Sequence, residues 1–322
     1  MNKAILITLT LSLLSCRQSK TIIEDNTFNI PQNENPSSAL KVTQLDPSEA
    51  YYGADFNDLE NKTLNEKTLI KKLVTILNGI HQRTTSEDKI VQSCPANEKC
   101  YKYNPYTYRD VRKFLFGKLY LKTINGEYTV TDTYCDHVIK NKDKVNGQDV
   151  VLGPDFYPSG SIINTEHLWP QSRFHQFKNE AAKNYTDNDK KNDLHHLMPT
   201  DPEVNSIRAA FPFGEVESSE TPLTCQSSVM GKAEGAKYST KDDSFFEPPQ
   251  RIKGDIARAL MYMSIRYEMY INDKQESFLR QWHKADPVDQ DEARRNNLIH
   301  KYQGTRNPFI DFPHLVDSIS DF

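Results

Sequence analysis

Two short segments concentrate the side chains that could carry chemistry. The first reads EHLWP (166–170), and the second reads DLHHLMPTDPEVNSIR (193–208). A neutral histidine can take a proton from water near neutral pH. Carboxylate and amide oxygens suit a hard divalent cation such as Mg²⁺, which keeps several waters. Together these groups predict hydrolysis of a phosphodiester bond, in which a base activates water and a cation offsets the growing negative charge.

Four side chains in these segments could share one site. Glu166 and Asn205 could supply the carboxylate and amide oxygens for the cation, and His167 could be the general base. Asn205 and Arg208 are three apart, so they share a face of a helix, and Arg208 could bind a phosphate. Neighbours on a regular strand point to opposite faces. Glu166 and His167 therefore reach one site only if the strand ends there, and Pro170 favours such an end.

The elements that must position these residues are a strand and a short helix. Residues 161–167 are a strand candidate that stops before Pro170. For a helix over residues 201–208, Asp201 can act as the N-cap and Pro202 fits the first helical position. Phosphate is favoured near such a helix end, because free N–H groups and the helix dipole point towards it.

The rest of the chain predicts a mixed, helix-rich α+β class in a single domain over residues 49–322. Apolar spacing predicts helices over residues 64–82, 108–121, 251–270 and 285–307. Strands are expected over residues 128–134 and 150–152. Residues 175–192 are interpreted as a surface loop, and residues 214–248 as irregular.

The first residues resemble an export signal. Residues 1–15 carry Lys3 and then an apolar stretch too short to span a bilayer. The stretch ends LLSC, which resembles a bacterial lipobox and predicts cleavage before Cys16 and its lipidation. A plain secretory peptide is the alternative. Residues 16–48 are polar and predict a tether, so the chain is expected to be anchored in the periplasm or at the cell surface, or secreted.

Export implies an oxidising compartment in which the remaining cysteines can pair. Cys94 and Cys100 are six residues apart around a turn, which leaves Cys135 with Cys225. A zinc site is the competing interpretation, but it lacks a C-x-x-C spacing. The formal net charge of −4 argues against a passive nucleic-acid coat protein, which would be basic. It does not argue against an enzyme with a local basic cleft.

With these two segments the chain resembles the bacterial endonuclease I family, within the His-Me finger (ββα-metal) nucleases. The two segments above are similar to the family's signature, and further similar blocks read PFGEV (212–216), KGDIAR (253–258) and QGTRNPF (303–309). The resemblance covers roughly residues 50–315. It implies a His-Me finger core and a nonspecific endonuclease that acts on DNA and often on RNA, leaving 5′-phosphate ends. It also implies His167 as general base, with Glu166 and Asn205 holding Mg²⁺ or a similar ion such as Mn²⁺ or Ca²⁺.

Two rival functions remain. A zinc hydrolase of another bond could use His167, His195 and His196, although adjacent histidines on a strand do not easily face one metal. A non-catalytic surface lipoprotein is the second rival. His195 is expected to be buried and hydrogen-bonded, and Trp169 to belong to the core or to cover the site. The sequence indicates no protein partner.

Overall fold

The computed structural model describes residues 47–178, 185–233 and 244–322. The expected signal segment, Cys16 and all but the last residues of the expected tether lie outside these ranges. Within them, no helix is long and apolar enough to cross a bilayer.

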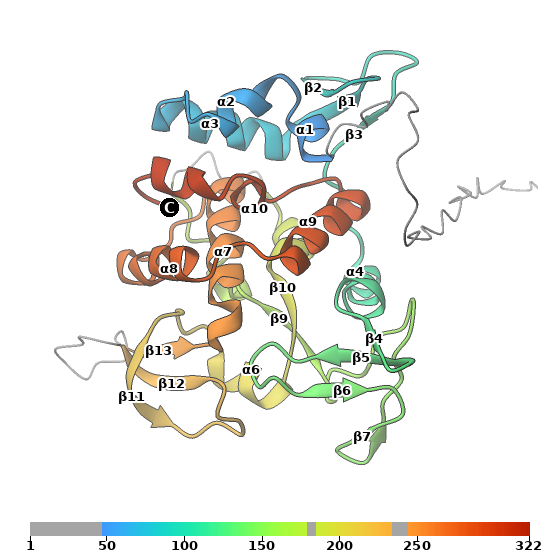
Figure 1. Cartoon of the computed structure of the whole chain (residues 1–322), viewed down its shortest axis with the longest axis vertical. Coiled ribbons are helices and arrows are strands. Elements are labelled where there is room, and N and C mark those ends of the chain that lie inside the picture. The colour runs from blue at the N-terminus through green and yellow to red at the C-terminus, as the bar shows by residue number, and fades with distance from the viewer. Residues whose placement is uncertain (1–46, 179–184, 234–243) are drawn as a thin grey trace, which may run out of the picture. The chain divides into compact units, whose positions relative to one another are not determined.

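Helices and small antiparallel sheets alternate along the chain, so the class is α+β as expected (Figure 1). The helices are α1 Pro47–Tyr52, α2 Phe56–Glu60, α3 Glu66–Asn78, α4 Tyr108–Phe114, α5 Asp187–Lys191, α6 Pro202–Arg208, α7 Lys253–Tyr267, α8 Asp273–Ala285, α9 Gln290–Gln303 and α10 Pro308–Asp311. A π-helical turn, Leu115–Leu119, continues α4.

The strands form five sheets among the described residues. The strands are β1 Ile80–Arg83, β2 Asp88–Val91, β3 Cys100–Tyr101, β4 Lys122–Ile124, β5 Glu127–Thr131, β6 Val138–Lys140, β7 Lys144–Val145, β8 Gln148–Asp149, β9 Asn164–His167, β10 Leu197–Thr200, β11 Val216–Thr221, β12 Val229–Ala233 and β13 Ser244–Glu247. The sheet orders are β2-β1-β3, β4-β5-β6, β7-β8, β10-β9 and β11-β12-β13.

Helix α7 is the centre of the larger hydrophobic core. All of its residues except Asp255 are buried, and it contacts α3, α8 and α10 (Figure 1). A helix that is buried all round must satisfy its charged side chains internally. Arg258 does so by binding the Glu292 carboxylate of α9 with two nitrogens. The apolar spacing of residues 251–270 predicted this helix correctly. The structure adds that the helix lies inside the core and not on its surface.

Several sequence expectations were wrong in detail. Residues 214–248 were expected to be irregular, but β11, β12 and β13 form a sheet there. The polar β11 carries two register irregularities, which obscure the alternation that marks a strand. The expected loop over residues 175–192 contains α5, which begins with a capping box between Thr186 and Asp189. Helix α8 was not predicted.

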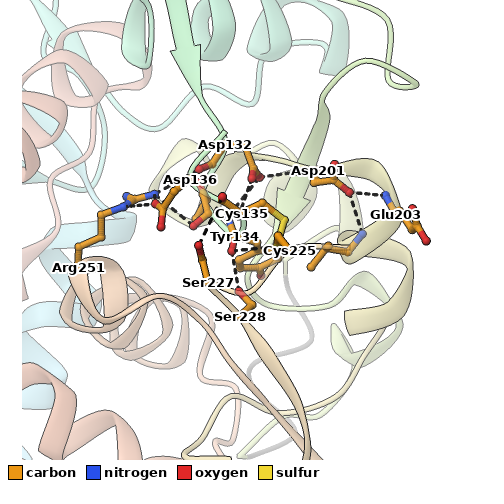
Figure 2. Close-up of a disulfide and its surroundings, with 12 residues drawn as sticks. Asp132, Tyr134, Cys135, Asp136, Asp201, Glu203, Cys225, Ser227, Ser228 and Arg251 are labelled. Carbon is orange, nitrogen blue, oxygen red and sulfur yellow. Dashed lines mark hydrogen bonds and ion pairs between the residues drawn. A yellow bond between two sulfur atoms is a disulfide. The ribbon is translucent and has the colours of Figure 1, made fainter. Parts of the chain in front are cut away.

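Both expected disulfides are present, Cys94–Cys100 and Cys135–Cys225. The second ties the turn after β5 to the segment before β12 (Figure 2). The Asp132 carboxylate accepts the backbone N–H groups of Cys135 and Asp201, so the same turn also reaches the N-cap of α6. In Figure 2, Asp132 and the disulfide flank Tyr134.

The two disulfides should differ in their contribution to stability. Replacing both Cys135 and Cys225 with serine opens a loop with a sequence separation of 90, and is expected to lower the free energy of unfolding by about 4 kcal/mol. The Cys94–Cys100 separation is 6, so its double serine variant should lose only about 2 kcal/mol. Urea unfolding of the two variants measures this difference. Equal losses would show that loop length does not govern the effect.

Candidate active site

The two chemistry-bearing segments meet because β9 pairs with β10. His167 lies opposite Leu197, and Glu166 lies opposite Met198. Strand β10 leads directly into α6, whose N-cap Asp201 accepts the backbone N–H groups of Glu203 and Val204. Pro202 occupies the first turn, as the sequence predicted. Strands β9 and β10 and the short helix α6 therefore lie together (Figure 1).

A pocket of about 440 Å³ opens between these elements. Glu166, His167 and Asn205 all line it, so the structure brings together the three residues expected to act. Tyr108 and Gln171 are among the other polar residues of its wall.

Glu166 is held by two donors that bind the same oxygen. Its Oε1 accepts a hydrogen bond from the Tyr134 hydroxyl at 2.7 Å and another from Arg208 Nη1 at 2.9 Å. The carboxylate is buried, and this burial raises its pKa, while the Arg208 charge opposes the rise. Because both side-chain donors bind Oε1, Oε2 has no side-chain donor among the residues that the structure describes.

His167 has one ring nitrogen fixed and the other turned to the pocket. Nε2 lies 3.1 Å from the Lys191 carbonyl oxygen, which can only accept a hydrogen bond, so Nε2 carries the proton. Nδ1 is then unprotonated and lies 3.4 Å from Nε2 of Gln171. Burial and the neighbouring His196 lower the pKa of His167 to about 3, which keeps the ring neutral at neutral pH.

Asn205 and Arg208 share a face of α6, but their surroundings differ. The Asn205 amide makes no hydrogen bond with the described residues and lines the pocket. Arg208 is only 1% exposed. Besides Glu166, it donates to the carbonyl oxygens of His167 and Leu168. Arg208 also lines the pocket, and its binding of a phosphate stays a prediction, although burial and these acceptors already occupy its guanidinium.

Two partners of the site were missed from the sequence. Tyr134 is 32 residues before Glu166, and nothing in its local pattern distinguishes it from the other tyrosines. Lys191 contributes a backbone oxygen, which no side-chain pattern can reveal. Trp169 is buried with its indole N–H on the Arg173 carbonyl, as expected of a core residue.

The neighbouring histidines serve the scaffold. Nε2 of His195 bonds the Thr305 carbonyl oxygen, and Nε2 of His196 bonds the Lys190 carbonyl oxygen. Both rings are buried, as expected for His195. One other group of side chains among the described residues has the types that can bind a metal ion. Asp132, Cys135 and His137 place their ligand atoms within 4.8 Å of one another. The Cys135 sulfur is in a disulfide, so this group does not form a zinc site.

Asp193 lies shortly before β10 and is fully buried, and its carboxylate accepts hydrogen bonds from several side chains; we call this group the Asp193 hub. Its Oδ2 accepts from Arg266 at 2.8 Å and from the hydroxyls of Tyr262 and Tyr267. Its Oδ1 accepts from Gln303. Burial acts to raise the pKa of Asp193, but the Arg266 charge and the hydrogen bonds outweigh it and lower the pKa to about 2.

Buried neutral histidines should make the fold sensitive to acid. Burial lowers the pKa of His195 and His196 to about 4 and that of His300 to about 3, below the usual 6.5. Between the folded and the unfolded pKa of each histidine, the unfolded chain binds more protons than the folded chain. The contribution of these histidines to the free energy of unfolding is therefore full above pH 6.5 and is lost as the pH falls. Each histidine can contribute up to about 1.4 kcal/mol per pH unit. Thermal unfolding from pH 7.5 to 4.5 measures the slope.

Matched variants test the cause of this slope. His300→Gln removes one buried titrating group and should flatten the slope by about one proton. His175→Gln changes an exposed side chain and should leave it unaltered. A slope that is the same in both variants and in the parent would contradict the explanation.

Comparison with known proteins identifies the family. Residues 96–314, more than half of the chain, match endonuclease I. The chain belongs to the endonuclease I family. The match contains both segments that build the pocket, which agrees with the resemblance noted in the sequence.

The relatives of this chain include proteins named as ribonucleases and proteins named as deoxyribonucleases. An extracellular ribonuclease of Bacillus amyloliquefaciens is 39% identical over 174 residues, which cover 48% of this chain and 53% of that protein. An extracellular deoxyribonuclease of Aeromonas hydrophila is 32% identical over 221 residues, which cover 63% of this chain and 89% of that protein. The aligned part of the chain thus spans about half the length of the ribonuclease. Two disulfides in this family member agree with an exported protein.

Proposed function

We propose that this chain is an exported, metal-dependent endonuclease that hydrolyses phosphodiester bonds of DNA and RNA without sequence specificity, leaving 5′-phosphate ends. The observation that carries the proposal is the shared pocket of Glu166, His167 and Asn205. The family match and the relatives named deoxyribonuclease and ribonuclease support it. In this proposal, β9, β10 and α6 are the His-Me finger core.

His167 is proposed as the general base through Nδ1. The Lys191 carbonyl oxygen fixes the proton on Nε2, so Nδ1 keeps its lone pair and faces the pocket. A water bound there could transfer its proton to Nδ1 while its oxygen attacks phosphorus. Gln171 lies beside Nδ1 and is placed to orient that water. The low pKa of His167 keeps the base neutral at the pH of the reaction.

Glu166 and Asn205 are proposed to hold one divalent cation such as Mg²⁺. Their oxygens fit this ion, because the Asn205 amide has no described partner and Oε2 of Glu166 has no side-chain donor. When bound, the ion would neutralise negative charge on the phosphate and on the leaving oxygen. Tyr134 and Arg208 are proposed as positioning residues, since both donate hydrogen bonds that fix the Glu166 carboxylate.

Absence of a base-reading motif supports low sequence specificity. No zinc finger, recognition-helix motif or RNA-binding signature is present in the sequence. Binding should therefore depend on phosphates and weaken steeply with salt.

Incubation of the purified chain with supercoiled plasmid and Mg²⁺ tests the proposal directly. Nicked and then linear DNA should form, and EDTA should stop the reaction. The cleavage ends should carry 5′-phosphates and show at most a mild sequence preference. If a metal-free preparation recovers activity with Zn²⁺ and not with Mg²⁺, the zinc hydrolase is the better assignment. No cleavage with any ion would favour the non-catalytic lipoprotein.

We also propose that Cys16 carries a lipid anchor. The proposal is supported by the apolar run that ends in LLSC and by export of the chain's relatives. Expression in a bacterial host should place the full chain in the membrane fraction with a lipid label, and Cys16→Ser should release it. An unlabelled parent chain that behaves like the variant would refute the anchor.

A further inference from the structure

A second pocket adjoins the catalytic pocket. It has a volume of about 560 Å³ and shares the side chains of Pro170, Arg208 and Ala210 with the catalytic wall. This size falls in the range of small-molecule sites, roughly 300–1,000 Å³. A ligand in it would therefore lie beside the phosphodiester bond that the proposed active site cleaves.

Aromatic side chains form much of its wall. Phe177, Phe211, Tyr270 and Trp169 line the pocket, and Tyr270 is 42% exposed. Exposed or half-exposed aromatic faces at a nucleic-acid site are platforms on which bases stack. Such stacking accepts any base, because every base has a π-face.

Unpartnered polar groups face the same space. Gln275 is only 8% exposed, yet its side-chain amide makes no hydrogen bond with the described residues. Its polar atoms are reached by solvent, so a ligand in the pocket can bind them. Nearby, Oδ1 of Asn272 caps α8, which leaves its amide nitrogen without a described acceptor. An amide can both donate and accept, as the edge of a nucleobase requires.

Arg173 lines both this pocket and a neighbouring one, and the two pockets also share Phe211. Its side chain forms no ion pair or hydrogen bond with the described residues, whereas Lys178 in the same wall is paired with Asp321. Burial and the nearby Arg208 charge lower the pKa of Arg173. An unpaired, half-buried guanidinium is a suitable partner for a phosphate.

The pocket wall is fixed in place before any ligand arrives. The N–H of Lys178 donates to the Glu268 carbonyl at 2.8 Å, and the N–H of Tyr270 donates to the Gln176 carbonyl at 2.9 Å. Between these bonds, Phe177 bridges to Met269. The aromatic wall is thus tied to the end of the buried helix α7.

We propose that this second pocket binds the unpaired base of the nucleotide next to the scissile phosphate, with Arg173 on that nucleotide's phosphate. The inference rests on the proposed nuclease function and adds a substrate class to it. A base in a duplex is stacked and paired, and extruding it costs a few kcal/mol. Single-stranded DNA or RNA has no such cost, so the pocket favours unpaired substrate.

Fluorescence of a five-nucleotide DNA with 2-aminopurine at its central position tests the pocket in EDTA, where no cleavage occurs. Stacking on the aromatic wall should quench the probe when the full chain binds the single strand, and a duplex containing the same probe should show no added quenching. Phe211→Ala and Gln275→Leu should each weaken the quenching titration by on the order of tenfold. Phe156→Ala, which removes an exposed aromatic side chain that lines neither pocket, should leave it unchanged.

The same preparations are assayed for plasmid cleavage with Mg²⁺, which separates two kinds of failure. Quenching that is equal in the duplex, or unchanged in both folded pocket variants, would overturn the base pocket. Plasmid cleavage without any quenching would also overturn it, while the nuclease function would stand. If the chain neither binds the strand nor cleaves plasmid, the proposed function fails and this inference fails with it.

Discussion

Replacement of His167 with alanine is expected to lower turnover by about a hundredfold to ten-thousandfold, the usual effect of losing a general base. Metal binding should survive, because His167 is assigned to water and its ring is held by the Lys191 carbonyl. Added imidazole should restore part of the activity, since it can enter the space that the side chain vacates. Cleavage rates and Mn²⁺ binding by calorimetry measure the two effects separately.

Glu166→Ala and Asn205→Ala are the matched controls. Each removes a proposed metal ligand, so each should weaken ion binding and recover some activity at high Mg²⁺ concentration. Imidazole should help neither variant. The reverse pattern, in which His167→Ala abolishes metal binding while Glu166→Ala and Asn205→Ala retain it, would show that the roles are wrongly assigned and would favour a histidine-metal site.

Asp193→Asn is expected to cause the largest loss of stability, about 3–5 kcal/mol. The variant keeps the size of the side chain but leaves the buried Arg266 without a countercharge. Removing one partner of a buried ion pair costs far more than the pair contributes, because the remaining charge stays desolvated. Urea unfolding measures the change in the free energy of unfolding, and a dye that reports aggregation confirms that the variant stays soluble.

An exposed pair in the same chain gives the control. Lys144 and Asp149 lie 2.8 Å apart, and both side chains are more than 70% exposed. Asp149→Asn should therefore change stability by less than about 1 kcal/mol. Similar losses in both variants would mean that burial of the Asp193 pair does not decide its effect.

The sequence predicted those parts of the site that depend on neighbouring residues. Helix α6 was predicted from its cap and its proline, because these signals lie within one turn of the helix that they start. Glu166, His167 and Asn205 were grouped from chemistry and spacing, and the structure places them at one pocket.

The parts that escaped prediction depend on distant contacts. Arg208 has the right charge for a phosphate, but only the fold reveals that Glu166 and two backbone carbonyls surround it. Tyr134 reaches the site through the turn that the Cys135–Cys225 bond secures, and that geometry arises only after long-range folding. The sheet of β11, β12 and β13 was missed because its first strand is polar and irregular in register.

The contacts of Asp193 have a consequence for the order in which the fold can be completed during synthesis. The hub lies next to β10, yet its partners Arg266 and Gln303 are 73 and 110 residues further along the chain. The ribosome makes about 5–20 residues per second, and N-terminal parts emerge first. A nascent chain that already contains Glu166, His167 and Asn205 still lacks the groups that neutralise Asp193. The buried Asp193 charge is therefore neutralised only after the last part of the chain has been made, so this part of the fold cannot be completed earlier in synthesis.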